Sequence, residues 1–353
     1  MRYIRFLKCP RVVVAKRSAQ HEAQCLITIT SDLGDSFLPH DVELAAELLA
    51  CGQQEQSIVW RTVQWTAGMR SLAVTLPVPR SRLSSTLRVR VGSRHGATSD
   101  TYEALLNTDS RGVVSVWSAE FTTTSMSTKH VERRFLLAGC DRLSIWEEAG
   151  ESIARHIWDA GVSLACNLEA LLDVAGFPII ESLPSQPGTR IRIIELGSGC
   201  GIVGISLAQR LRNVEVVLTD LSETRDIVIR NIESAIVAKD SSVQFHELEW
   251  GADLPICLQA PSPSFTLLVA ADCTYNPDSS KALVKTFQRL AHVFPDVVIA
   301  IAMKFRHASE QVFFKNMNAS GFEERVAYTQ RLPSDYDSTN WDKLCVFLYT
   351  YRT

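Results

Sequence analysis

The sequence predicts an α/β protein in which a doubly wound sheet of seven strands follows a smaller, mostly β domain with a sandwich-like arrangement. The last two thirds of the 353-residue chain alternate short apolar runs with amphipathic segments of helical period, as strands alternate with the helices that cover them. The first third carries short β-like runs separated by polar turns, which favours an antiparallel sandwich. We expect a β-rich domain over residues 1–121, a linker over 122–130 and the α/β domain over 131–353.

The β-like runs of the first domain predict strands with different strength. Leu87, Val89 and Val91 alternate with arginines, which is the period of a half-buried strand. Residues 40–49 fit a strand and a helix, because apolar side chains recur there at both spacings. The expected strands cover residues 24–30, 57–65, 69–76, 86–91 and 113–121.

In the second domain, expected strands and helices alternate. Residues 265–271 form an apolar run that would be buried on both faces of a sheet. Residues 222–237 are typical of a helix with Ser222 as its N-cap, and residues 278–293 of a helix that stops before Pro295. The other expected elements are a helix at 202–211 and strands at 191–196, 214–219, 243–248, 297–303, 323–328 and 344–351.

Composition narrows the classes of function. A hydrophobic content of 46% and a net charge of −3 are typical of a globular protein. The chain has no excess of basic residues of the kind that binds nucleic acid. No apolar run reaches the roughly 18 residues of a membrane span. The nine cysteines include no Cys-x-x-Cys pair, so we expect reduced thiols and no metal site. Reduced thiols favour a cytoplasmic location, with the nucleus as the alternative.

A glycine-rich turn, Glu195-Leu-Gly-Ser-Gly-Cys-Gly201, follows the first strand of the second domain. Such a turn lets a ligand approach backbone that no side chain covers. Two cofactors compete, because residues 199–204 also match the dinucleotide fingerprint. Glu195 favours S-adenosylmethionine, since an acid there suits the ammonium of the methionine moiety and would repel a pyrophosphate. The candidate cofactor-binding residues of the turn are Glu195, Gly197, Gly199 and Gly201.

Polar and aromatic side chains follow the next strands. Asp220 ends the second strand, where its carboxylate could accept hydrogen bonds from ribose hydroxyls; the alternative is an N-cap of the next helix. Trp250 lies just past the third strand, where an indole could stack on adenine, and core packing is the alternative. Trp158, in Ile157-Trp-Asp-Ala-Gly161, leaves the same two interpretations open.

The segment Asp272-Cys-Thr-Tyr275 follows the fourth strand and therefore faces the expected cofactor cleft. A carboxylate there could hold a cationic amine, and a tyrosine could supply a hydroxyl or a ring face. Methyl transfer requires the lone pair of the amine to point at the methyl carbon, so orientation is most of the task. Asp272 and Tyr275 are therefore candidate catalytic residues. The alternative is that Asp272 caps the loop leading to Asp278.

With these positions together, residues from about 131 to 353 resemble the family-16 seven-β-strand methyltransferases, the protein-lysine N-methyltransferase group with a Rossmann-like sheet. The resemblance implies that Asp272 and Tyr275, the Asp-x-x-Tyr motif of the family, serve the lysine. It implies cofactor contacts from Trp158, Gly197, Ser198, Gly199, Asp220, Trp250 and Ala271. Its motifs are Ile157-Trp-Asp-Ala-Gly161, the glycine turn, Leu218-Thr-Asp-Leu221, Asn231-Ile232, Leu248-Glu-Trp-Gly251 and Ala271-Asp-Cys-Thr-Tyr275, in this order.

The resemblance implies an S-adenosylmethionine-dependent protein-lysine N-methyltransferase, with a translation elongation factor or a chaperone as its substrate. The N-terminal domain is hypothesised to recruit that protein. A small-molecule methyltransferase would keep every cofactor residue. An NAD-dependent oxidoreductase would use the same glycines, although no Tyr-x-x-x-Lys constellation accompanies them. We expect a monomer whose partner is a protein that presents a lysine, without membrane contact and without direct nucleic-acid binding.

Overall fold

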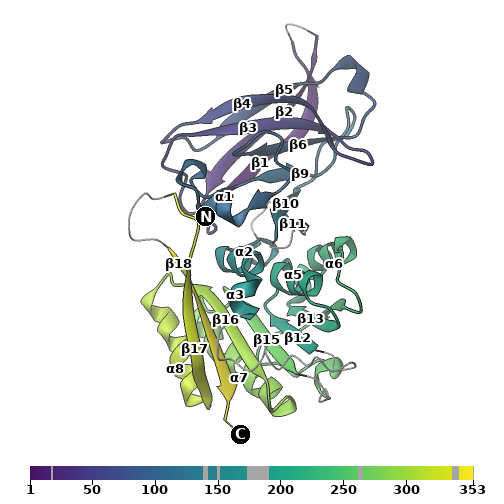
Figure 1. Cartoon of the computed structure of the whole chain (residues 1–353). Helices are drawn as coiled ribbons and strands as arrows, with labels where there is room; N and C mark the ends of the chain where they lie inside the picture. The colour runs from purple at the N-terminus through teal and green to yellow at the C-terminus, as the bar shows by residue number, and fades with distance from the viewer. Residues whose placement is uncertain are drawn as a thin grey trace. The chain divides into compact units, whose positions relative to one another are not determined.

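The chain divides into two compact units in the computed structural model (Figure 1). Unit 1 comprises Met1–His156 and Leu332–Trp341, and unit 2 comprises Ile157–Arg331 and Asp342–Thr353. The structure describes residues 1–16, 19–137, 142–148, 152–172, 191–260, 265–335 and 342–352. Within these residues, no helix combines the length and the apolar character that crossing a bilayer requires.

Unit 1 contains two sheets. Sheet A has the strand order β5-β2-β1-β8, and sheet B has the order β11-β10-β9-β6-β3-β4, with β7 paired to β10. The strands are β1 (Arg2–Val14), β2 (His21–Thr30), β3 (Val42–Ala50), β4 (Gln56–Trp65), β5 (Leu72–Pro77), β6 (Leu87–Gly92), β7 (Asp100–Thr101), β8 (Val113–Val114), β9 (Val116–Ser118), β10 (His130–Leu136) and β11 (Arg142–Glu148), and the one α-helix assigned in the described part of this unit is α1 (Tyr102–Leu106).

The two sheets of unit 1 share one hydrophobic core. Ile27 and Ile29 of sheet A pack in the same cluster as Leu48 and Val89 of sheet B. Alternate residues of β2, β3 and β6 contribute to this core, which is the arrangement of a β-sandwich. The predicted mostly β domain is confirmed, and the ambiguous residues 40–49 belong largely to strand β3. Strand β1 had no sequence signal, because register shifts at Phe6/Lys8 and Lys8/Arg11 interrupt its alternation.

Strands β10 and β11 belong to sheet B rather than to the α/β unit. Glu132 of β10 lies opposite Trp117 of β9, and β10 pairs along its whole length with β11. Charged groups reinforce this pairing, since the Glu132 carboxylate accepts from Arg134 at 2.8 Å and from Arg88 of β6 at 2.5 Å. Unit 1 thus extends to His156 and does not end at residue 121, the boundary that the sequence favoured.

A second stretch of the chain, Leu332–Trp341, also belongs to unit 1. It follows strand β17 of unit 2, so the chain returns to unit 1 near its end. Leu332 is fully buried, and the nearly buried Asp335 forms an ion pair with Arg2 at 3.0 Å. Unit 1 is therefore built from two separate stretches of sequence.

Unit 2 contains one sheet, sheet C, with the strand order β14-β13-β12-β15-β16-β18-β17. The first five of these strands run parallel, β18 runs antiparallel to β16, and β17 runs antiparallel to β18. The strands are β12 (Ile191–Leu196), β13 (Val214–Asp220), β14 (Ser242–Glu247), β15 (Thr266–Ala271), β16 (Val298–Lys304), β17 (Phe322–Arg331) and β18 (Lys343–Tyr351).

Helices cover both faces of sheet C (Figure 1). Ile194 and Val217 of the sheet share a buried cluster with Phe287 of α7 and Phe313 of α8. On the other face, Gly204 of α5 lies close enough to β13 that an added Cβ would sit 2.3 Å from Leu218. The helices are α2 (Asp159–Cys166), α3 (Leu168–Leu172), α5 (Ile202–Arg210), α6 (Arg225–Ser234), α7 (Pro277–Val293) and α8 (Gln311–Ala319).

The predicted doubly wound sheet is confirmed, and it defines where a ligand can bind. Strand β12 is flanked by β13 on one side and β15 on the other, so the strand order reverses next to β12. Open sheets of this kind bind ligands at such a reversal, outside the carboxyl ends of the strands. One expected detail is wrong: residues 222–237 form the 3₁₀ turn η4 (Ser222–Thr224) and the shorter helix α6, whose N-cap is Thr224.

Candidate active site

The glycine turn after β12 has the backbone conformation that the sequence indicated. Gly197, Gly199 and Gly201 have φ values of 65°, 54° and 80°. Only glycine adopts this region at little cost, because a Cβ would approach the backbone. Gly201 is the N-cap of helix α5, so the turn aims the first N–H groups of that helix at the edge of the sheet.

Two side chains from other strands close around Gly197. A Cβ added at this position would lie 2.7 Å from Cys273 Sγ and 2.9 Å from Trp250 Cζ2. The indole of Trp250, which follows β14, therefore lies directly against the turn. Cys273 donates its thiol hydrogen towards the carbonyl oxygens of Leu196 and Ala271, both at 3.3 Å, and so joins β12 to β15.

Asp220 also reaches the turn. Its Oδ2 accepts a hydrogen bond from Gly199 N at 2.7 Å, and its Oδ1 accepts from Leu221 N at 2.7 Å. Burial raises the pKa of this carboxyl group above its usual value. The carboxylate thus binds the glycine turn and its own neighbour rather than helix α6, whose first residue is Arg225. This geometry leaves ribose binding open and gives no support to the helix-cap alternative.

Ser198 supplies an observation that tests whether a cofactor fits here. Its hydroxyl oxygen is buried and has no hydrogen-bond partner among the described residues. A buried polar atom without a partner costs free energy unless a ligand or water satisfies it. Ser198 lies in the turn between two glycines of positive φ, and the second of them, Gly199, donates its N–H to Asp220. The residues present therefore fit a polar nucleoside cofactor such as S-adenosylmethionine.

Glu195 lies beneath the turn. Its side chain is buried, and its Oε2 accepts a hydrogen bond from Gly204 N of helix α5 at 2.7 Å. Burial, with a smaller contribution from the charge of Asp220, raises the pKa of Glu195 to about 8. The carboxyl group therefore caps helix α5 and carries a proton at neutral pH unless a cation approaches it.

Glu195→Gln is expected to alter the pH dependence of stability of the ligand-free protein. Between about pH 4.5 and 8, native Glu195 keeps a proton that the unfolded chain releases, so wild-type stability falls as the pH rises through this window. Glutamine still accepts from Gly204 N but does not titrate. In thermal melts, the stability of the variant relative to the wild type should rise with pH. At pH 8.5 the difference in the free energy of unfolding should be roughly 3–5 kcal/mol.

A matched control for this prediction is Glu247→Gln, because Glu247 is an exposed glutamate at the end of β14. Its pH profile should follow that of the wild type. Parallel profiles for Glu195→Gln and the wild type would show that the buried carboxyl group titrates normally.

Asp272 occupies the turn after β15 and has an uncommon backbone conformation, with φ at 54°. Its carboxylate is buried and accepts four hydrogen bonds. Oδ2 accepts from Ala160 N of helix α2 at 2.9 Å and from Arg306 Nη2 at 3.4 Å. Oδ1 accepts from Arg306 Nη1 at 2.8 Å and from Lys304 N at 3.3 Å. These donors use the four acceptor positions of a carboxylate.

Trp158 lies on the other side of the same arginine. It is the N-cap residue of helix α2, and the Arg306 guanidinium carbon stands 5.9 Å from the centre of its ring. Next to it, Lys304 Nζ pairs with Asp159 at 3.2 Å and with Asp342 at 2.7 Å. Asp272 and Trp158 are thus brought together, and Arg306 and Lys304 are site residues that sequence reasoning missed.

Tyr275 and Ala271 differ from Asp272 in exposure. Tyr275 is 49% exposed, and burial of the other half raises the pKa of its hydroxyl. Ala271, the last residue of β15, is half-buried. Of the two candidate catalytic residues, Tyr275 alone is presented to solvent.

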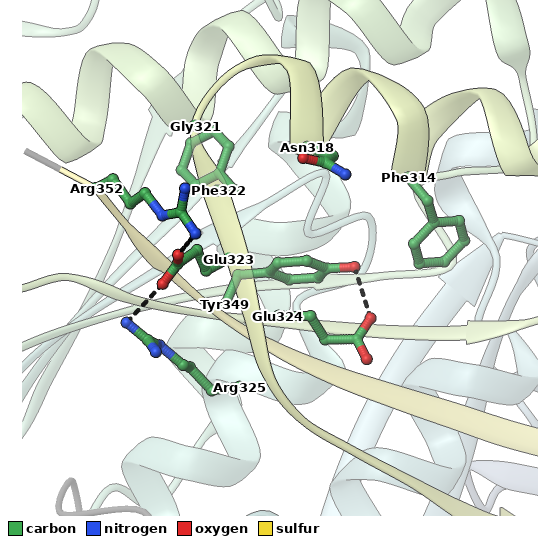
Figure 2. A pocket seen from close by; sticks show the side chains of 9 residues that line it. All are labelled: Phe314, Asn318, Gly321, Phe322, Glu323, Glu324, Arg325, Tyr349 and Arg352. Atoms are coloured by element: carbon green, nitrogen blue, oxygen red, sulfur yellow. Dashed lines mark hydrogen bonds and ion pairs between the residues drawn. The ribbon is translucent and has the colours of Figure 1, made fainter.

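The described residues also line a cavity of about 520 Å³ that is distinct from this site (Figure 2). It lies around the beginning of β17 and the end of β18. These strand ends lie at the side of sheet C where the parallel strands have their amino-terminal ends, because Val298 at the start of β16 lies opposite Thr350 of β18. In Figure 2, Arg352 and Arg325 both reach Glu323, and the Tyr349 hydroxyl reaches Glu324. The cavity is therefore at the opposite edge from the glycine turn.

Comparison with known proteins agrees with this geometry. Residues 139–320 match the lysine methyltransferase family, and the chain belongs to that family. A UPF0665 family protein of Schizosaccharomyces pombe is 28% identical over 321 residues, which cover 89% of this chain and 92% of that protein. Protein N-lysine methyltransferase METTL21A of Danio rerio is 28% identical over 185 residues, or 52% and 74% of the two chains. EEF1A lysine methyltransferase 3 of Mus musculus is 27% identical over 197 residues, or 55% and 75%.

Family membership confirms the predicted enzyme class. The chain is a protein-lysine N-methyltransferase, its methyl donor is S-adenosylmethionine, and its partner is a protein that presents a lysine. Membership of this family excludes the NAD-dependent oxidoreductase alternative. The roles of the individual site residues remain predictions.

Proposed function

We propose that this enzyme methylates the side-chain amine of a lysine in a protein substrate at the carboxyl edge of sheet C. The observation that carries the proposal is the glycine turn of positive φ, which binds the Asp220 carboxylate through Gly199 N. Within this turn, the buried hydroxyl of Ser198 has no hydrogen-bond partner among the described residues. This set of groups fits a polar nucleoside cofactor. The adjoining turn from Asp272 to Tyr275 provides the face that the acceptor amine would approach.

When bound, S-adenosylmethionine supplies an electrophilic methyl carbon that an amine nitrogen attacks with its lone pair, with loss of a proton from the amine. In our proposal, the backbone of Gly197 and Gly199 and the hydroxyl of Ser198 hold the methionine part. Asp220 accepts from the ribose hydroxyls with the lone pairs that Gly199 N and Leu221 N leave. Trp250, against Gly197, offers its ring face to the adenine. Glu195, Gly201, Trp158 and Ala271 complete the proposed cofactor site.

The two candidate catalytic residues take different parts in this proposal. Tyr275 is exposed and can contact the acceptor side chain directly, through its ring face or its hydroxyl. Asp272 is buried and its acceptor positions are taken, so its contribution is to fix the turn that carries Tyr275. Methyl transfer depends on the orientation of the amine, which a fixed turn supports.

For the substrate, we propose a translation elongation factor first and a chaperone second, in the cytoplasm. The name of the mouse relative specifies EEF1A, which supports testing EEF1A before other proteins. We propose that unit 1 recruits the protein substrate. The match to the Schizosaccharomyces pombe protein covers most of both units, which is consistent with a shared role for them.

Labelled S-adenosylmethionine tests the function directly. The purified enzyme is incubated with labelled cofactor and a cell lysate, and separately with EEF1A. The expected result is label on lysine in a discrete protein band. Label found only in small molecules would favour a small-molecule methyltransferase, and no label in either fraction would contradict the proposed function.

Asp220→Ala is expected to weaken cofactor binding more than it weakens the fold. Loss of charge-assisted hydrogen bonds to ribose should lower the affinity for S-adenosylhomocysteine by about 1.5–3 kcal/mol, or roughly 10- to 150-fold. Calorimetry measures the affinity, and thermal melting measures the stability. Glu223→Ala, which removes an exposed carboxylate from the following turn, is the control and should bind normally. Unchanged affinity with a lower melting temperature would leave Asp220 only its structural hydrogen bonds.

A further inference from the structure

Arg306 lies just past β16, at the same edge of sheet C as the cofactor site. Its two terminal nitrogens bind the two oxygens of Asp272, at 2.8 Å and 3.4 Å, and its side chain is only 11% exposed. Arg306 Nη1 also donates to the carbonyl oxygen of Lys304 at 3.3 Å. The guanidinium thus stands where a substrate ammonium would have to stand if Asp272 were its counter-ion.

The backbone around Arg306 is also held in place. The N–H groups of Arg306 and His307 both donate to one carboxylate oxygen of Glu310, at 2.9 Å and 3.0 Å. Glu310 is almost fully buried. With the Trp158 ring on one side and Asp272 on another, the arginine is fixed at both its backbone and its side chain. Its displacement by an incoming lysine would expose a buried carboxylate and break several hydrogen bonds.

Two other charged side chains nearby, Lys304 and Glu310, also have partners. Lys304, at the end of β16, pairs with Asp159 of α2 and with Asp342, which precedes β18. In the 3₁₀ turn η6 (Ala308–Glu310), Glu310 accepts hydrogen bonds from the backbone N–H groups of Arg306 and His307. Tyr275, on the same turn as Asp272, is uncharged at neutral pH, and burial raises its pKa further. Arg306 is therefore the group that decides whether the charge of Asp272 is available.

We propose that Arg306 is a positioning residue for methyl transfer: by occupying Asp272 it keeps the substrate amine from binding there as an ammonium, so that the acceptor nitrogen arrives neutral. This inference rests on the proposed function. Only a neutral amine has a lone pair to form the new carbon–nitrogen bond. An uncovered carboxylate would stabilise the protonated amine and raise its pKa in the complex.

Arg306→Gln and Arg306→Lys test the inference in the full-length enzyme loaded with S-adenosylhomocysteine. The probe is n-butylammonium, which mimics a lysine side chain and needs no identified protein substrate. Calorimetry should detect butylammonium binding to Arg306→Gln and none to the wild type or to Arg306→Lys. Equal binding to the wild type would show that an ammonium displaces Arg306, and absence of binding to all three would show that Asp272 attracts no cation. Either result overturns the inference.

Turnover gives a second readout, with the protein acceptor labelled by the wild-type enzyme. The acidic limb of the kcat profile should move to higher pH in Arg306→Gln, by about one pH unit, with at least a tenfold loss at neutral pH. In Arg306→Lys, the acidic limb of the kcat profile should lie at the same pH as in the wild type. The matched control is Arg289→Gln, which removes an arginine paired with the exposed Asp253 and should leave the profile unchanged.

The outcomes separate the two proposals. A wild-type enzyme that labels no lysine contradicts the proposed function, whereas butylammonium binding still tests Arg306. A loss of activity in Arg306→Gln with an unmoved acidic limb would mean that Arg306 only supports the fold. Faster turnover in that variant would mean that Arg306 competes with the substrate.

Discussion

Replacing Asp272 by alanine is expected to lower both the stability and the activity of this enzyme by large amounts. The substitution removes the partner of the buried Arg306 guanidinium and the acceptor for Ala160 N at the start of helix α2. Leaving one member of a buried ion pair unpaired costs about 3–5 kcal/mol. Methylation by the fraction that remains folded should fall about 10²-fold or more, because the turn that carries Tyr275 loses its fixed position. Thermal melting and steady-state methylation measure the two effects.

Two further variants show which part of Asp272 matters. Asp272→Asn keeps an acceptor for Ala160 N and tolerates the positive φ, but it cannot neutralise Arg306. It should therefore show an intermediate loss. Asp342→Asn is the matched control, because Asp342 is a 44% exposed partner of Lys304 in the same network and such pairs contribute little. Near-normal turnover by Asp272→Asn would show that the charge has no role and that the residue is a loop cap.

Gly197→Ala is expected to have the second large effect, on cofactor binding. The new Cβ would lie 2.7 Å from Cys273 Sγ and 2.9 Å from the Trp250 ring, at a φ of 65° that alanine adopts poorly. Crowding and backbone strain together should cost roughly 2–4 kcal/mol of stability. The affinity for S-adenosylhomocysteine should fall about 10²-fold or more, because Trp250 must move away from the turn.

Gly321→Ala separates strain from crowding. Gly321 has a φ of 86°, but a Cβ there would meet nothing closer than Tyr351 Cε2 at 3.6 Å. It lies at the opposite edge of sheet C, next to the cavity in Figure 2. This control should lose about 1 kcal/mol of stability and no affinity for S-adenosylhomocysteine. If Gly197→Ala behaved like Gly321→Ala in both measurements, close packing around the turn would have no role in binding.

The parts of the site that the sequence predicted well are those in which local chemistry decides the structure. Alternating glycines after an apolar strand specify a turn of positive φ, and all three glycines adopt it. Asp220 could be placed near that turn because the carboxyl ends of neighbouring parallel strands meet at one edge. The position of Trp250 against Gly197 follows from the same reasoning.

The parts that could not be predicted depend on contacts between distant segments. Arg306 lies 34 residues after Asp272, and Ala160 lies 112 residues before it, so no spacing reveals that both saturate one carboxylate. The available signal was an arginine placed just after the strand at 297–303, at the same edge as Asp272. Residues 131–156 were placed in the α/β domain for a similar reason: no strand was expected between 121 and 191, and the pairing of β10 with β9 is a contact that the local sequence does not specify.

The return of the chain to unit 1 limits how this protein can be dissected. A catalytic fragment that starts at Ile157 would still carry the Leu332–Trp341 stretch, which belongs to unit 1 and includes the ion-pair partner of Arg2, Asp335. The buried carboxylate of Asp335 would lose Arg2. Inactivity of such a fragment would therefore report damage at the cut surface as much as loss of recruitment. A cleaner dissection would also replace the 332–341 stretch with a short polar linker between β17 and β18.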